Sequence, residues 1–338
     1  MKKVKSYLLF FCLCTIVFIG CTRKEEIEQS EVVLPLKLLF DNNLNAKALG
    51  DPVHSVNRIL VLPFQKLNPL LPDNNLNNYA PLYLFARQWN VASFPVGNLV
   101  LKLPRNFAYK VLVIGYNSND YDFNNQGATS NRFSIGSAVS PTRLDNFHLY
   151  PKSPNVVPEF FTCYLTATNG SIVIGTTFTP TSDVNLTLSG QLNRIVSGLT
   201  VKITAIPGYV KSISLMAERM VKAIRVSDTI ASLVQTTGGT ESRLIQKLVP
   251  SAGQVLFSNI LLPTMTTYKT KLYLNVSYGS VTDIYTIKIN DSQVSSDNSI
   301  ILKPNRVVNI SGPYNKINLG FELSYTIKLD DGKWDGLQ

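Results

Sequence analysis

Short runs of alternating apolar and polar residues recur along the chain and predict strands rather than helices. The clearest covers 199–206, where Leu, Val, Ile and Ala occupy every second position and Thr and Lys lie between them. A second covers 269–278, with Leu272, Leu274 and Val276 on one side. Because strand side chains alternate between the two faces of a sheet, each run predicts a strand with one buried face.

Other apolar runs bounded by Gly, Pro, Asn or Asp predict further strands. The run 56–64 is apolar on both alternating sets, as a central strand requires. Pro35 lacks an N–H group, so the run 32–40 is expected at a sheet edge. The stretch 213–224 stays open between strand and helix, since Met216, Met220 and Ile224 recur at a spacing of four. The remaining predicted strands are 94–103, 108–117, 161–165, 172–174, 184–188, 212–217, 254–257 and 283–290.

Composition agrees with an all-β chain, since only 16% of residues are charged while Asn, Ser, Thr, Tyr, Val, Ile and Leu recur throughout. The 338 residues exceed what one ordinary core needs. A Thr/Ser-rich stretch around Pro180 separates two halves with the same pattern. We therefore predict two β-sandwich domains, 32–180 and 181–338.

The first thirty residues predict a lipoprotein export signal. Lys2, Lys3 and Lys5 precede an apolar stretch that ends at Gly20 and is too short for a mature membrane anchor. The residues before Cys21 resemble a lipobox, so residues 1–20 are expected to be removed and Cys21 to be lipidated. The polar segment 21–31 then forms a tether, and its Lys-Glu-Glu run resembles a surface-export signal of Bacteroidota lipoproteins. The predicted location is the outer membrane, facing the cell exterior.

The mature chain offers little chemistry for catalysis. Loss of three lysines lowers the formal charge from +10 to +7, and no basic run indicates nucleic-acid binding. Two histidines, His54 and His148, lack partners at a metal-ligand spacing, and no nucleotide-binding or nucleophile motif follows a strand. Cys163 is the only cysteine after Cys21, so no internal disulfide is expected unless Cys21 takes part. We predict a binding or structural protein with no cofactor and no metal, and not an enzyme.

Several segments carry a resemblance to a known family. They are 56–64, 107–117, the closing stretch 302–310 with Trp334, and above all 186–201, which contains the pattern Leu-x-Arg-x-Val-x-x-Leu-x-Val from Leu192 to Val201. Together they resemble the fimbrillin superfamily of Bacteroidales, the subunits of type V pili. The resemblance implies two tandem transthyretin-like Greek-key β-sandwich domains and a place in a fimbria, contributing to adhesion.

The resemblance also implies assembly by strand donation between subunits. In the family a protease that cuts after Arg or Lys removes the first strand, and a strand from another subunit fills the groove. The corresponding cut sites here are Lys47 and Arg58. The first strand would contain Val32, Val33, Leu34, Leu36, Leu38 and Phe40, and a C-terminal donor strand would contain Leu319, Phe321, Leu323, Tyr325 and Ile327.

The role within a pilus stays open between stalk, accessory and anchor subunit. An anchor would keep its first strand and its lipid, whereas a stalk subunit would lose both. The expected partners are other pilus subunits, the outer membrane through Cys21, and a host protein or glycan receptor. An alternative function is a surface glycan-binding lipoprotein of a polysaccharide-uptake system, with a sugar-stacking platform formed by Tyr79, Tyr83, Phe85 and Trp89.

Overall fold

The computed structural model describes most of the chain after residue 29. The described residues are 30–39, 56–91, 99–120, 142–149, 157, 159–221, 223–227, 243–264, 269–289, 298–317 and 320–328. The predictions for the export signal, Cys21, Phe40, Lys47, Leu319 and Trp334 lie outside these residues.

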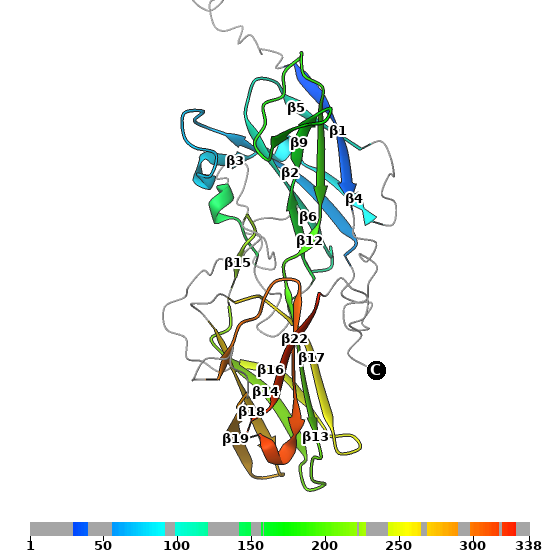
Figure 1. Cartoon of the computed structure of the whole chain (residues 1–338), viewed down its shortest axis with the longest axis vertical. Helices are drawn as coiled ribbons and strands as arrows, with labels where there is room; N and C mark the ends of the chain where they lie inside the picture. Colours follow the sequence, from blue (N-terminus) through cyan, green and yellow to red (C-terminus); the bar gives the residue numbers. More distant parts are fainter. Residues whose placement is uncertain are drawn as a thin grey trace, which may run out of the picture. The chain divides into compact units, whose positions relative to one another are not determined.

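The first pair of sheets is built from strands between residues 31 and 194 (Figure 1). One sheet has the order β10-β9-β11-β1-β5, with β1 (Glu31–Leu39), β5 (Leu99–Pro104), β9 (Thr166–Asn169), β10 (Ile172–Gly175) and β11 (Leu186–Gln191). The other has the order β12-β8-β6-β2-β3, with β2 (Arg58–Lys66), β3 (Tyr79–Pro81), β6 (Tyr109–Tyr116), β8 (Phe161–Tyr164) and β12 (Asn193–Arg194). Strand β4 (Arg87–Asn90) also pairs with β2. Short 3-10 helices are η3 (Leu76–Asn78), η4 (Tyr83–Phe85) and η6 (Leu144–Asn146).

These two sheets pack face to face as a sandwich, called here the first sandwich. Its core takes Leu34, Leu101 and Leu188 from one sheet and Val61 and Val113 from the other. The opposite face of β2 and β6 is buried too, against a separate apolar cluster, and β6 is buried along its whole length. The prediction that the run 56–64 forms a central strand is thereby confirmed, since β2 lies between β6 on one side and β3 and β4 on the other.

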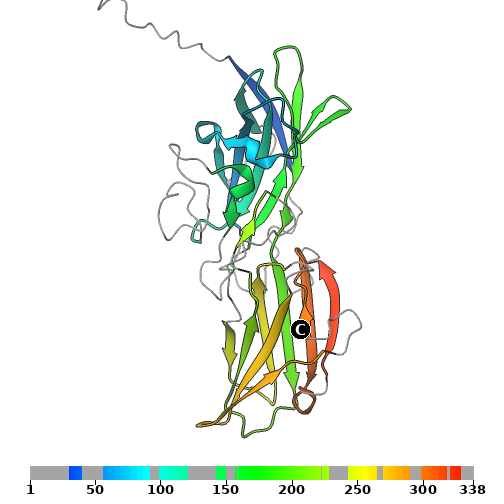
Figure 2. The ribbon, with the colours of Figure 1, turned by 90° about the vertical axis from the view of Figure 1, so that its left-hand side faces the viewer.

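Strands from residue 197 onward form a second sandwich, whose two layers are seen in Figure 2. One sheet is β17-β13-β21-β22, with β13 (Ser197–Thr204), β17 (Val255–Leu261), β21 (Arg306–Pro313) and β22 (Glu322–Lys328). The other is β16-β14-β18-β19, with β14 (Ser212–Glu218), β16 (Arg243–Leu248), β18 (Thr270–Ser277) and β19 (Thr282–Thr286), and β20 (Ser299–Ile300) pairs with β18. Helix η7 (Tyr314–Lys316) follows β21, and β7 (His148–Leu149) pairs with β15 (Ile224–Arg225).

The all-β sandwich prediction is confirmed, and two local expectations are corrected. The stretch 213–224 begins as strand β14, and its alternative as a helix is wrong because β14 pairs with both β16 and β18. The edge position expected for 32–40 is also wrong, because β1 lies between β11 and β5. Pro35 is tolerated there since the register of β1 with β11 begins only at Leu36.

The division into two domains remains a prediction. Strands β11 and β12, which follow the predicted boundary at residue 180, pair with β9 and β8 of the first sandwich. If the two sandwiches are separate domains, strand pairing therefore places the boundary between Arg194 and Ser197.

The passage that carried the strongest resemblance joins the two sandwiches in sequence. Leu192 is buried in the first core, whereas Leu199 and Val201 are buried in the second. Between them Arg194 is fully buried, and its Nη2 atom lies 2.8 Å from Oε1 of Glu159. Each prominent position of the pattern thus fills a buried site.

Two further observations bear on expectations from the sequence. Among the described residues no helix is long and apolar enough to span a membrane. Cys163 is a free thiol in the first core, and burial raises its pKa to about 12. The thiol therefore stays protonated at physiological pH and packs as a small apolar side chain.

Candidate functional site

The first strand of the described chain, β1, occupies a slot inside the first sandwich. Its sequence alternates, so that Leu34 and Leu36 are buried while Val33 is 54% exposed. Pro35 and Lys37 face outward with Val33. The predicted strand 32–40 thus corresponds to β1, whose residues Val32 and Leu38 are partly buried against the same core.

Two strands form the walls of this slot. On one side β1 runs parallel to β11, with Leu36 opposite Leu188 and Leu38 opposite Gly190. On the other side β1 neighbours β5, whose alternate leucines belong to the same core. A β-carbon at Gly190 would lie 2.8 Å from Leu165 Cδ2, so a larger residue at this position of β11 would force neighbouring core side chains to shift.

The slot supplies both backbone hydrogen bonds and apolar contacts. Full burial of a leucine side chain contributes about 1.5–3 kcal/mol. Leu34 and Leu36, at 0% and 6% exposure, together contribute roughly 3–6 kcal/mol. Removal of β1 would expose this apolar surface and leave the facing edges of β5 and β11 unpaired. Another strand with the same alternation of apolar and polar residues could cover this apolar surface and pair with the free edges of β5 and β11.

The two candidate cut sites have different surroundings. Arg58 is the first residue of β2 and pairs with Asn90 on β4 and with Tyr116 on β6. A protease binds its substrate in an extended, accessible form, so cleavage at Arg58 requires β2 to leave the sheet. Lys47, outside the described residues, is the only Lys or Arg between Phe40 and Asn57 in the sequence.

The predicted C-terminal donor segment forms strand β22 of the second sandwich. Among the described strands it lies at the edge of its sheet and pairs with β21 alone, with Leu323 opposite Ile310 and Tyr325 opposite Val308. Phe321, just before the strand, is fully buried. An edge strand is held on one side only, so its release breaks fewer hydrogen bonds than release of a central strand.

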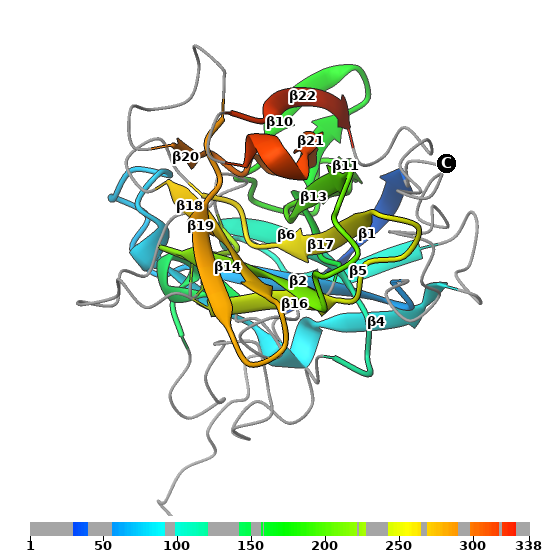
Figure 3. The ribbon, with the colours of Figure 1, turned by 90° about the horizontal axis from the view of Figure 1, so that it is seen from below.

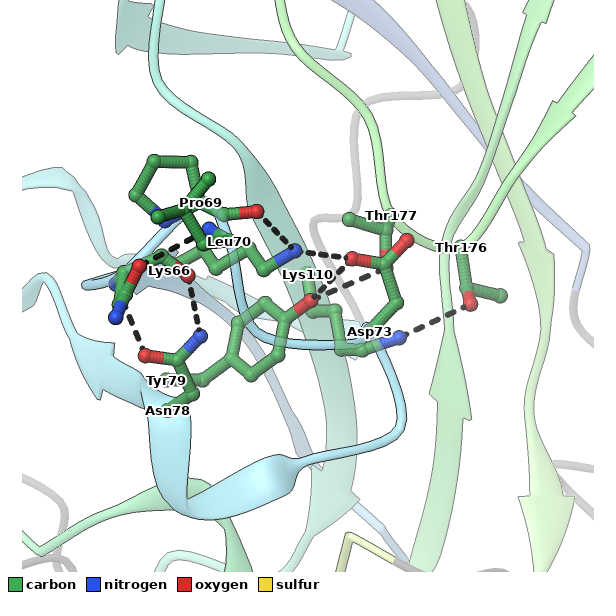
Figure 4. Close-up of polar contacts among 10 residues, drawn as sticks. Lys66, Pro69, Leu70, Asp73, Asn78, Tyr79, Lys110, Thr176 and Thr177 are labelled. Carbon is green, nitrogen blue, oxygen red and sulfur yellow. Dashed lines mark hydrogen bonds and ion pairs between the residues drawn. The ribbon is translucent and has the colours of Figure 1, made fainter.

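A polar cluster orders the loop that follows β2 (Figure 4). Lys66 Nζ lies 2.6 Å from Asp73 Oδ1 and donates to the Pro69 carbonyl at 3.3 Å. The Asn78 side chain closes the same loop, because it donates to the Asn68 carbonyl at 2.7 Å and accepts from the Asn68 N–H at 2.9 Å. These bonds hold residues 67–78 against the end of the first sandwich.

A second lysine of this cluster is almost completely buried. Lys110 Nζ lies 3.4 Å from Thr176 Oγ1 and sits 5.4 Å above the Tyr79 ring and 5.7 Å from the Tyr164 ring. Burial lowers the pKa of Lys110, and the charge of Asp73 opposes this effect. The cation is stabilised by two aromatic faces, which makes it a structural group in this arrangement.

The four aromatic residues predicted as a sugar-stacking platform do not form one. Tyr79 is fully buried, and Tyr83 packs against the same apolar cluster. Phe85 and Trp89 pack instead against the core between the sheets, on the opposite face of β2. The sheet that contains β2 therefore separates the four side chains, with two packed on one of its faces and two on the other.

Sequence reasoning missed parts of the site that come from distant positions. The walls of the slot are β5 and β11, which lie about 65 and 150 residues after β1 and carry no motif that links them to it. The buried pair of Glu159 and Arg194 joins residues 35 positions apart. Among the described residues, no group of three or more His, Cys, Asp or Glu is placed to hold a metal ion.

Comparison with known proteins shows similarity at the level of the fold. No family model matches the sequence, and no curated protein matches it. A solved structure of a candidate adhesin from Bacteroides ovatus ATCC 8483 matches with a TM-score of 0.50 at 12% identity, covering 91% of this chain and 98% of that chain.

Two solved fimbrial proteins of Porphyromonas gingivalis also match. The fimbrial anchor protein Mfa2 has a TM-score of 0.47 at 8% identity and covers 83% of this chain and 90% of its own. The tip fimbrial protein Mfa3, with a C-terminal truncation, has a TM-score of 0.40 at 13% identity and covers 88% of this chain and 99% of its own. The match to the Bacteroides ovatus adhesin shows a shared fold, in agreement with the fimbrillin-like resemblance of the sequence.

Proposed function

We propose that this chain is a cell-surface fimbrial subunit that contributes to adhesion and joins other subunits by exchange of a β-strand. The observation that carries the proposal is the position of β1, a central strand that one cut before β2 would separate from every other strand described. The shared fold with a candidate adhesin supports the adhesive role, and the resemblance to fimbrillins supports the fimbria.

Within this proposal, Lys47 is the preferred cut site. It is the only Lys or Arg in the connection between β1 and β2, whereas Arg58 pairs with strands on both sides. Cleavage after Lys47 releases the lipid on Cys21 together with β1. A chain that escapes this cleavage keeps both and serves as an anchor.

The first experiment determines the N-terminus of the chain on the cell. The chain is expressed with its leader in a Bacteroidota host, isolated from the surface and analysed by mass spectrometry and denaturing electrophoresis. An N-terminus directly after Lys47, in material that runs as an SDS-resistant ladder, is expected for a polymerising subunit. A lipidated Cys21 on an intact chain that co-purifies with other subunits is expected for an anchor.

Two matched variants sharpen this experiment. Lys47→Gln is expected to abolish both the new N-terminus and the ladder, while Arg58→Gln leaves them unchanged. The proposal is overturned if the chain at the surface carries no other subunit, whether it is cleaved after Lys47 or intact. It is also overturned if the chain retains residues 1–20.

The slot itself is tested in solution. A chain that begins at residue 48 is mixed with a synthetic peptide of residues 30–40, and complex formation is measured by size-exclusion chromatography. The wild-type peptide is expected to bind, and a peptide with Leu34→Asp is not, because a carboxylate would replace a fully buried leucine. Equal behaviour of the two peptides contradicts strand complementation.

A further inference from the structure

Four tyrosines gather at one end of the second sandwich, although they come from separate parts of the sequence. Tyr209 lies in the loop between β13 and β14, Tyr278 directly follows β18, Tyr285 lies on β19, and Tyr314 begins η7. The β18–β19 hairpin and η7 lie at the lower end in Figure 1 and face the viewer in Figure 3. Together with Asp283, these four residues are called the tyrosine cluster.

Three hydroxyl groups and a carboxylate of the cluster form one hydrogen-bonded chain. Tyr285 donates to Asp283 Oδ2 at 3.2 Å, and the Tyr278 hydroxyl lies 3.0 Å from that of Tyr285 and 2.8 Å from that of Tyr314. A phenol has a single proton. Tyr278 therefore donates to only one of its two neighbours, and in each of these two contacts either hydroxyl can be the donor.

The two ends of this hydrogen-bonded series can bind a ligand. The Tyr314 hydroxyl can accept a further hydrogen bond. The exposed carboxylate of Asp283 accepts more than the one bond from Tyr285. The carboxylate therefore favours a ligand that carries hydroxyl donors and disfavours an anion.

The pKa values of two hydroxyl groups in this hydrogen-bonded series are raised, so both hydroxyls stay protonated. Burial raises the pKa of Tyr278, and its hydrogen bonds with Tyr285 and Tyr314 raise it further. Burial also raises the pKa of Tyr314. The arrangement therefore persists across the physiological pH range.

An aromatic ring lies exposed beside this chain. Tyr209 is 62% exposed, and its ring centroid lies 5.8 Å from that of Tyr278 with an angle of 38° between the rings. Tyr278 is half-buried, and Ile284 on the same hairpin is 70% exposed. A β-carbon placed on Gly208 or Gly279, which adjoin the two tyrosines in sequence, would meet open space.

The backbone around the cluster is fixed by hydrogen bonds. The Tyr278 N–H donates to the Val281 carbonyl at 2.9 Å, which closes the turn of the β18–β19 hairpin. The Lys211 N–H donates to the Ser277 carbonyl at 2.7 Å, which ties the loop of Tyr209 to the same hairpin. The site is therefore organised before a ligand binds, and little ordering entropy opposes binding.

We propose that the tyrosine cluster binds a sugar ring of a neutral glycan. A pyranose has an apolar C–H face that can stack on Tyr209 and hydroxyl groups that can donate to Asp283 and Tyr314. An exposed aromatic side chain, acceptor groups beside it and a fixed backbone are the features that such a ligand requires. The proposal goes beyond strand exchange and does not depend on it, since the cluster and the β1 slot lie in different sandwiches.

The test measures glycan binding by the full mature chain. An array of neutral and acidic glycans identifies a bound structure, and saturation-transfer NMR with the methyl glycosides of glucose, galactose, mannose and fucose measures contact with single rings. Tyr209→Ala is expected to weaken binding by roughly three- to ten-fold through loss of stacking. Gly208→Gln adds a longer side chain next to Tyr209 in sequence and is expected to weaken binding, while the thermal midpoint stays unchanged because a β-carbon at this position meets open space.

A control variant separates this site from another tyrosine of the same sandwich. Tyr273 lies on β18 in the same sandwich, where its hydroxyl donates to Glu218 at 2.7 Å. Tyr273→Ala is expected to leave glycan binding unchanged. The proposal is overturned if no neutral glycan binds, if only acidic glycans bind, or if Tyr209→Ala and Tyr273→Ala behave alike. None of these outcomes affects the N-terminus or the ladder, so this failure is distinguishable from failure of the pilus proposal.

Discussion

Truncation of Leu34 on β1 measures how much the first strand contributes to the first sandwich. The side chain is completely buried in the core between the two sheets. Replacement of a buried leucine by alanine loses its transfer free energy and leaves a cavity, which together cost about 3 kcal/mol within a range of 2–5. For a urea dependence of about 2 kcal/mol per molar, Leu34→Ala should lower the unfolding midpoint by roughly 1.5 M.

The chain contains a suitable probe for this measurement. It has two tryptophans, and Trp89 packs against the same core as Leu34. In a Trp334→Phe background the fluorescence of Trp89 therefore reports unfolding of the first sandwich alone. Urea titrations of this parent and of Leu34→Ala give the difference in free energy of unfolding.

Val33→Ala provides the matched control on the neighbouring residue. Val33 is 54% exposed, so its truncation is expected to change stability by less than about 0.5 kcal/mol. Equal midpoints for the two variants would show that β1 does not hold Leu34 in the core. That result would refute both the packing described here and the slot on which the proposed function depends.

Three further changes test separate features. Asp73→Asn should cost less than about 1 kcal/mol at pH 7, because the carboxylate is 56% exposed and solvent screens its bond to Lys66. The bond to Lys66 lowers the pKa of Asp73 in the folded chain. The stability that this bond contributes is therefore present above pH 3.8, the ordinary pKa, and is lost as the pH falls through the lowered pKa of the folded chain. Thermal melts between pH 7 and pH 2 would follow this loss. Glu159→Gln should cost about 3–5 kcal/mol by leaving the Arg194 charge buried without its carboxylate, measured by urea unfolding against the parent. Gly312→Ala should destabilise the second sandwich by about 1–3 kcal/mol, because its β-carbon would enter an aromatic ring, and an unchanged thermal midpoint would contradict this packing.

The strands with strong periodicity could be predicted from the sequence. β13 and β18 alternate strictly, and β2 is apolar on both sets of positions, so local pattern alone identified them. β16 was missed, since Ile245 is its only fully buried residue and the alternation is weak. A strand whose faces differ little in exposure leaves no periodic signal.

One error and one choice left open arose where pairing between distant strands overrides a local rule. Pro35 indicated an edge strand, yet its missing N–H falls before the register of β1 with β11 begins at Leu36. Met216 lies in register with Leu244 and Tyr273, and this pairing on both sides overrides the spacing of four that suggested a helix. Pairing between distant strands decided both cases, and no short window of sequence contains that information.

The functional sites were harder to predict for the same reason. Tyr79 and Trp89 are close in sequence, but a sheet separates their side chains. Tyr209 and Tyr314 lie 105 positions apart and belong to one cluster, because Tyr278 lies between them and contacts both. Closeness along a strand-rich chain therefore says little about closeness in space.

The two sandwiches share an arrangement that gives β1 its special position. In the second sandwich β13 lies between β17 and β21 and is parallel to β21, just as β1 lies between β5 and β11 and is parallel to β11. Release of β13 would need two cuts, since strands precede and follow it, and it would separate the sandwiches. One cut in the connection before β2 is enough to free β1 from all the other strands described. The proposed strand exchange therefore needs only a single cleavage, which would open a central slot at β1 and leave the rest of the chain continuous.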